Sequence, residues 1–105
     1  MKIKTNRLRR ILIDIFKRHN LNSSHALICA DALINAELVG APTHGLSRLK
    51  MYCDRINKKV INPKPKIKIK KISQSIAHID ANNSIGFVAG DIGIKQAIKN
   101  AKSTG

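Results

Sequence analysis

The sequence predicts an α+β protein, with three helices in residues 1–62 and a β-hairpin followed by a fourth helix in residues 63–105. Three observations lead to this class. Through the first half of the chain, apolar residues recur at the spacing of helices. Two prolines, Pro63 and Pro65, then exclude helix. Isoleucine and lysine next alternate strictly over residues 66–70, as they do in a strand with one apolar face.

The first helix is predicted over about residues 5–19. Its apolar residues repeat at i, i+3, i+4, i+7 and i+8, which is the pattern of one buried stripe. Thr5 and Asn6 are the candidate N-caps, and Asn20 lies where the helix should stop. The stripe consists of Leu8, Ile11, Leu12, Ile15 and Phe16.

A second helix is predicted over about residues 25–39 and a third over about residues 46–59. The turn at residues 21–24 offers N-cap side chains to the second helix, and Gly40 should end it. The predicted packing side of the second helix is Ala26, Leu27, Ala30, Leu33, Ile34 and Leu38, and that of the third is Leu46, Leu49, Tyr52, Cys53 and Ile56.

The β-hairpin is predicted from residues 66–70 and 75–80, with its turn near Ser73 and Gln74. Turn-forming residues at 80–84 lead into the last helix. Two strands alone are marginal, so this part is predicted to open an α/β domain that the 105 residues leave incomplete. The predicted packing side of the last helix is Val88, Ile92, Ala97, Ile98 and Ala101.

The charge is unusual, with 20 Lys+Arg against 6 Asp+Glu and a formal net charge of +14. Such an excess raises nucleic acid as a partner. However, the basic residues are spread from Lys2 to Lys102, and at 3% aromatic content there is no ladder for base stacking. A solvated basic surface is the favoured interpretation. A free-standing basic module that binds nucleic acid or another partner remains the alternative.

Other classes are excluded more simply. No apolar run approaches the roughly 18 residues of a membrane-spanning helix, so no membrane association is predicted. Cys29 and Cys53 form neither a disulfide framework nor a zinc pattern, so no metal site is predicted. Two unpaired thiols indicate a reducing compartment, and we expect a cytoplasmic protein.

The candidate site is the connector before the third helix. His44 lies beside Gly45 just before a helix start, and helical continuation would put Arg48 and Tyr52 on its face. Thr43 adds a hydroxyl beside the imidazole. Arg48 could hold a small carboxylate and His44 could exchange a proton near neutral pH. On spacing alone, a capping threonine with solvated neighbours explains the same residues.

Residues 32–52, ALINAELVGAPTHGLSRLKMY, resemble the N-terminal signature of the malate/L-lactate dehydrogenase family. That family also contains ureidoglycolate and sulfolactate dehydrogenases. Its pattern is a small-residue helix, a glycine, a Ser-His-Gly triplet, an arginine and a tyrosine. The resemblance continues through Ile61-Asn62-Pro63, through residues 78–86 and through the final helix.

The resemblance implies an N-terminal fragment of an NAD- or NADP-dependent oxidoreductase that acts on small 2-oxo or 2-hydroxy acids. It implies a non-Rossmann cofactor domain, a homodimer, and an inactive fragment because most nicotinamide contacts lie beyond this stretch. His44 would be the acid/base residue assisted by Thr43, Arg48 would bind the substrate carboxylate, and Tyr52 would line the pocket. Thr43 replaces the usual serine, and Lys59 lies near where the pattern prefers glycine.

Overall fold

The computed structural model describes residues 4–104. Within them the chain forms four α-helices and one two-stranded antiparallel sheet, which confirms the predicted α+β class. The elements in order are α1 (Thr5–Arg18), α2 (Ser23–Leu38), the short 3₁₀ turns η1 (Pro42–His44) and η2 (Leu46–Arg48), α3 (Leu49–Asn57), β1 (Lys68–Lys71), β2 (Ala77–Asp80) and α4 (Gly86–Thr104).

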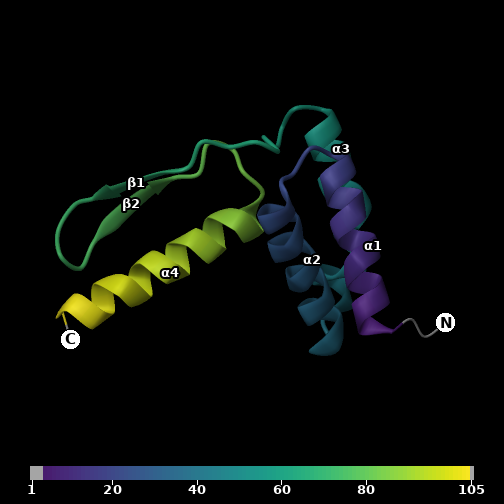
Figure 1. Ribbon diagram of the computed structural model, residues 1–105, viewed down its shortest axis with the longest axis horizontal. Helices are drawn as coiled ribbons and strands as arrows, with labels where there is room; N and C mark the ends of the chain where they lie inside the picture. The colour runs from purple at the N-terminus through teal and green to yellow at the C-terminus, as the bar shows by residue number, and fades with distance from the viewer. Residues whose placement is uncertain (1–3, 105) are drawn as a thin grey trace.

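The molecule has two regions (Figure 1). Helices α1, α2 and α3 pack together as the helical unit, and β1, β2 and α4 extend away from it as the arm. The Cα radius of gyration is 15.2 Å, against about 13 Å for a compact domain of this length. The accessible surface is 7405 Å², against roughly 5,800 Å² for a compact monomer of this mass. The extended arm therefore leaves much of its surface uncovered.

Helices α1, α2 and α3 all end in the same way. The residue two places beyond each helix has a positive φ, at 73° for Asn20, 78° for Gly40 and 62° for Lys59. The N–H of that residue donates to the carbonyl three residues back, and the next N–H donates to the carbonyl five back. These paired bonds satisfy the last helical carbonyls. The predicted stops at Asn20 and Gly40 are confirmed, whereas Lys59 holds this conformation without glycine's freedom.

The predicted N-termini need correction. The N-cap of α1 is Lys4 without a side-chain cap bond, so neither Thr5 nor Asn6 caps it. Asn6 instead accepts a hydrogen bond from Arg9 at 3.1 Å. Helix α2 begins two residues earlier than predicted, because Asn22 Oδ1 accepts from the backbone N–H of His25 at 2.8 Å.

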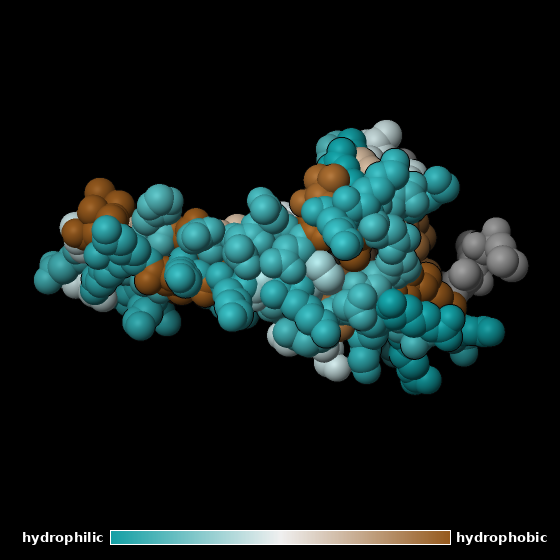
Figure 2. Space-filling model, turned by 90° about the horizontal axis from the view of Figure 1, so that it is seen from above, coloured by the Kyte–Doolittle hydropathy of each residue, from teal (hydrophilic) through white to brown (hydrophobic). Residues whose placement is uncertain are grey.

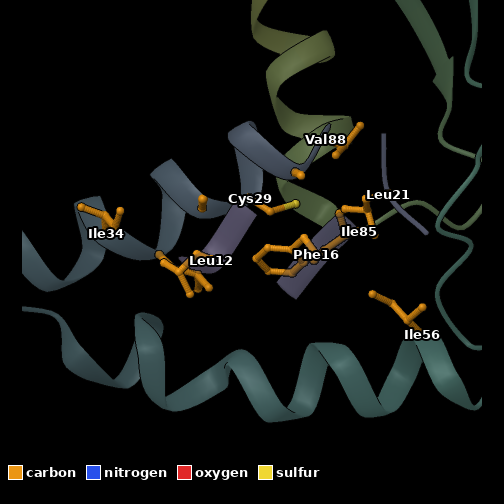
Figure 3. Packing of buried hydrophobic residues seen from close by; sticks show 11 residues of the cluster. Leu12, Phe16, Leu21, Cys29, Ile34, Ile56, Ile85 and Val88 are labelled. Carbon is orange, nitrogen blue, oxygen red and sulfur yellow. The ribbon is translucent and has the colours of Figure 1, made fainter. Parts of the chain in front are cut away.

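The core lies almost entirely in the helical unit (Figure 3). Phe16 and Cys29 are fully enclosed, whereas Leu27 and Leu38 are 42% and 71% exposed, contrary to prediction. The helical period explains the difference, because Leu27 and Leu38 lie at the edge of the α2 face that is buried. The buried apolar side chains of this region are Leu12, Phe16, Leu21, Ala26, Cys29, Ala30, Leu33, Ile34 and Ile56.

The arm forms the predicted hairpin, with β1 antiparallel to β2 and Ile69 opposite Ile79. On α4, Val88 is buried as predicted, but Ile98 is 50% exposed and the polar Asn100 is buried instead. Only the first turns of α4 reach the core of the helical unit, and the hairpin alone accompanies the rest (Figure 1). The predicted apolar side of α4 is therefore only partly covered.

A polar cluster joins the segments that enter and leave the hairpin. Asn82 Oδ1 accepts from Asn62 Nδ2 at 3.0 Å and from the backbone N–H of Lys66 at 2.9 Å. The N–H of Asn62 donates to the carbonyl of Asn83 at 2.8 Å. Asn82 and Asn83 have φ values of 52° and 58°, which confirms the predicted turn. These bonds fix where the arm leaves the helical unit.

Across residues 4–104, the structure contains no helix whose length and apolar character would let it cross a membrane.

Candidate active site

The connector between α2 and α3 is not the start of a continuous helix. Two 3₁₀ turns, η1 and η2, precede α3, which begins at Leu49 and ends at Asn57. Gly45 separates the two turns with φ −103° and ψ −135°, values outside the helical region. The predicted helix over residues 46–59 is therefore too long at both ends. His44 and Tyr52 do not share one helical face, because Gly45 interrupts the regular turn.

The structure nevertheless brings three of the four predicted site residues together. Thr43 Oγ1 lies 3.1 Å from His44 Nδ1, a hydrogen bond whose direction depends on the imidazole tautomer. Arg48 Nε donates to the backbone carbonyl of Thr43 at 2.6 Å. Thr43 and His44 are exposed and Arg48 is half-buried. A hydroxyl, an imidazole and a guanidinium thus meet at one open loop.

This arrangement has a clear chemical capacity. Because Nδ1 of His44 bonds the threonine hydroxyl, Nε2 is the ring nitrogen that this contact leaves for proton exchange. A guanidinium has five N–H donors, so Arg48 keeps its two terminal nitrogens for a carboxylate after Nε has bonded Thr43. The loop can therefore bind a small anion beside a proton donor.

Tyr52 lies apart from these contacts. It is half-buried on α3, and its ring meets that of Phe87 edge to face at a centroid distance of 5.3 Å. Phe87 belongs to the first turn of α4, so the pair joins the helical unit to the arm. Such aromatic contacts stabilise packing by about 0.5–1.5 kcal/mol beyond the buried area. The contact that the structure gives to the Tyr52 ring is therefore one of packing against Phe87.

Glu37, which sequence reasoning did not single out, reaches the same loop from α2. Its Oε1 accepts from the backbone N–H of Leu46 at 2.9 Å. Gly45 is buried against it, and a Cβ there would lie 2.5 Å from the same oxygen. One sequence signal was available, because Glu37 is the only glutamate of the chain and stands nine residues before Leu46.

Neither thiol is suited to nucleophilic chemistry at neutral pH. Burial raises the pKa of Cys29 from 9.0 to about 12. Burial, and then the neighbouring Asp54 carboxylate, raise the pKa of Cys53. Among residues 4–104, no three His, Cys, Asp or Glu side chains cluster as ligands for a metal ion.

A hollow of about 500 Å³ lies elsewhere, where the helical unit meets the arm. Its walls come from the end of α3, the segment after it and the turn between α1 and α2. The lining residues are Asn20, Ile56, Asn57, Lys59, Ile61, Asn62 and Pro63.

Comparison with known proteins assigns the chain to a family. The malate/L-lactate dehydrogenase family matches residues 3–105. The chain is 36% identical to the L-sulfolactate dehydrogenase of Methanocaldococcus jannaschii over 105 residues, which are 100% of this chain and 30% of that protein. It is 35% identical to the malate dehydrogenase of Pyrococcus horikoshii, covering 100% of the chain and 29% of the relative.

Solved structures agree with the sequence match. The malate dehydrogenase from Pyrococcus horikoshii superimposes with a TM-score of 0.95 at 35% identity, over 100% of this chain and 30% of that one. The sulfolactate dehydrogenase from Methanocaldococcus jannaschii gives the same TM-score at 36% identity and the same coverage. The chain thus spans about 30% of the length of these relatives. Because the family match covers 103 of the 105 residues, the chain belongs to the malate/L-lactate dehydrogenase family.

Proposed function

We propose that the chain is part of an NAD- or NADP-dependent dehydrogenase that transfers a hydride between nicotinamide and a small 2-oxo or 2-hydroxy acid. The observation that carries this proposal is the Thr43–His44–Arg48 cluster in a chain of this family. Relatives are named for malate, sulfolactate and ureidoglycolate, which all carry a hydroxyl beside a carboxylate. One relative is named with NAD(+) and another with NADP(+), so both cofactors remain in the proposal.

In this proposal each residue of the loop has a role that its chemistry permits. A bound nicotinamide would supply the hydride-transfer chemistry for a reaction between a 2-oxo acid and its 2-hydroxy acid. His44 gives the proton to the carbonyl oxygen in reduction and takes it back in oxidation. Thr43 holds the imidazole through Nδ1, and Arg48 binds the substrate carboxylate with its terminal nitrogens. Tyr52 lines the pocket beside Phe87.

We further propose that residues 1–62 form the helical substrate side and that residues 63–105 open the cofactor domain, of a fold distinct from the Rossmann type. The uncovered apolar surface of the arm supports this division, because a completed domain would bury it. From membership of this family we also propose that the 105 residues alone are inactive and that the whole enzyme is a cytoplasmic homodimer. The matches reported above are all dehydrogenases, so they do not support the alternative of a basic nucleic-acid-binding or partner-binding module.

Replacing Arg48 tests the assignment in the whole enzyme. Arg48→Ala should raise the KM for oxaloacetate or pyruvate about 100-fold, since a charge-assisted bond contributes up to about 3 kcal/mol. Cofactor binding, measured by NADH fluorescence, should stay near normal. Arg9→Ala is the matched control, because Arg9 pairs with Asp31 on the surface at 2.7 Å, away from the loop. Equal loss of substrate and cofactor binding in Arg48→Ala would contradict the carboxylate role.

A further inference from the structure

We propose that Glu37 is the positioning residue of the 43–48 loop, setting the placement of His44 and Arg48 through its bond to the backbone of Leu46. The inference rests on the function proposed above for that loop. Three observations carry it.

The first observation is the place of the bond. Leu46 is the first residue of η2, and N–H groups at such a start lack a partner within the turn. The Oε1 atom of Glu37 supplies the missing acceptor at 2.9 Å. Leu46 lies two residues from both His44 and Arg48, so this bond anchors the middle of the loop to α2.

The second observation is the choice of partner. In a chain with 20 Lys+Arg, carboxylates usually find a basic side chain. Four of the aspartates among residues 4–104 do so, namely Asp14, Asp31, Asp54 and Asp91. The bond that the structure gives to the Glu37 carboxylate leads instead to a backbone amide of the candidate site.

The third observation is the space kept for the carboxylate. Gly45 is buried, and a Cβ on it would come within 2.5 Å of Glu37 Oε1 and 2.9 Å of Glu37 Cδ. A larger residue would push the flexible glutamate side chain out of its bond with Leu46. Gly45 and Glu37 therefore act together. Within the same loop, Arg48 Nε donates to the carbonyl of Thr43 at 2.6 Å.

The experiment combines hydrogen exchange and kinetics in the whole enzyme. In Glu37→Ala, the Leu46 amide should exchange at least 10-fold faster, measured by mass spectrometry on peptides covering residues 43–48. The kcat for oxaloacetate reduction should fall about 30-fold with the KM for NADH unchanged, because His44 is misplaced while the cofactor site is intact. Glu37→Gln should restore both values to near wild type, because its amide oxygen still accepts the bond.

Two further variants complete the series. Gly45→Ala should reproduce Glu37→Ala by displacing the carboxylate. Asp31→Asn is the matched control, since Asp31 lies on the same helix and pairs with Arg9 at the surface. It should leave exchange and kcat unchanged.

The proposal would be overturned if the Leu46 amide exchanged as slowly in Glu37→Ala as in the wild-type enzyme. Equal damage in Glu37→Gln and Glu37→Ala would also overturn it, because the charge rather than the acceptor would then matter. If the wild-type enzyme reduces no 2-oxo acid, the proposed function fails, while the exchange rates still decide whether Glu37 holds the loop.

Discussion

The helical unit and the arm differ in how they bury apolar surface. Nine buried apolar side chains lie in or directly between α1, α2 and α3, whereas the arm side contributes Ile85 and Val88 at the start of α4. Farther along the arm, apolar side chains face solvent, and Figure 2 shows hydrophobic patches on it between hydrophilic side chains. The isoleucines concerned, each 48–58% exposed, are Ile69, Ile72, Ile76, Ile94 and Ile98.

This contrast indicates where the stability of the chain resides. Burial of apolar area is the main favourable contribution to folding, at about 25 cal/mol per Å². The helical unit has this contribution and the outer arm largely lacks it. The candidate site is attached to the stable region, since its loop joins α2 to α3 and bonds to Glu37. A rigid support of this kind suits a site that must hold a substrate in one orientation.

The largest expected effect tests the contrast directly. Phe16→Ala removes a ring that is 0% exposed and should lower the free energy of unfolding by about 3–5 kcal/mol. Ile94→Ala, at a position 58% exposed, should lower it by less than about 1 kcal/mol. Denaturant titration followed by circular dichroism measures both values. Similar losses at the two positions would mean that the arm is packed as firmly as the helical unit.

A second expected effect uses the thiol of Cys29 to report on the helical core. Its folded pKa of about 12 exceeds the ordinary value of 9.0. Above pH 9 the unfolded thiol loses its proton while the folded thiol keeps it. The unfolded state then binds fewer protons, so the free energy of unfolding falls as the pH rises from 9 toward 12, by up to about 1.4 kcal/mol per unit.

Denaturant titrations at pH 8, 9 and 10 measure this pH dependence. The reference is Cys29→Ala, in which other groups titrate but this thiol is absent. A fall above pH 9 that is identical in both proteins would show that Cys29 is not shielded from water.

The smallest expected effect concerns the junction between the two regions. Lys59 has a φ of 62°, which costs a residue with a Cβ about 1 kcal/mol relative to glycine. Lys59→Gly should therefore raise the free energy of unfolding by about 0.5–1 kcal/mol. Lys58→Gly is the matched control, because Lys58 has an ordinary φ of −83° and should gain nothing. A loss of stability in Lys59→Gly would show that the lysine side chain contributes to the junction.

Local sequence signals predicted most of the fold. Asn20 and Gly40 mark helix ends because asparagine and glycine tolerate positive φ. The alternation around Ile69 predicted the hairpin, because side chains on a strand alternate between two faces. The start of α2 was misplaced, because several polar residues in that turn could cap it and only the fold selects Asn22.

The candidate site was predicted in part. The sequence singled out Thr43, His44 and Arg48 by residue type and spacing, and in the structure these three residues are joined by hydrogen bonds. It also predicted one helical face extending to Tyr52, which is wrong because Gly45 interrupts the helix. Glu37 was missed because its bond to Leu46 joins two elements across the α2–α3 connector.

By itself the sequence determined the class of the protein, the order of its elements and the residue types at the loop. These properties follow from backbone preferences and apolar periodicity, which act over a few neighbouring residues. The tertiary structure alone decided which apolar side chains are covered, how the 43–48 loop turns, and that a carboxylate from α2 holds it. Those outcomes depend on where separate helices meet in space, and no local preference of the chain specifies that.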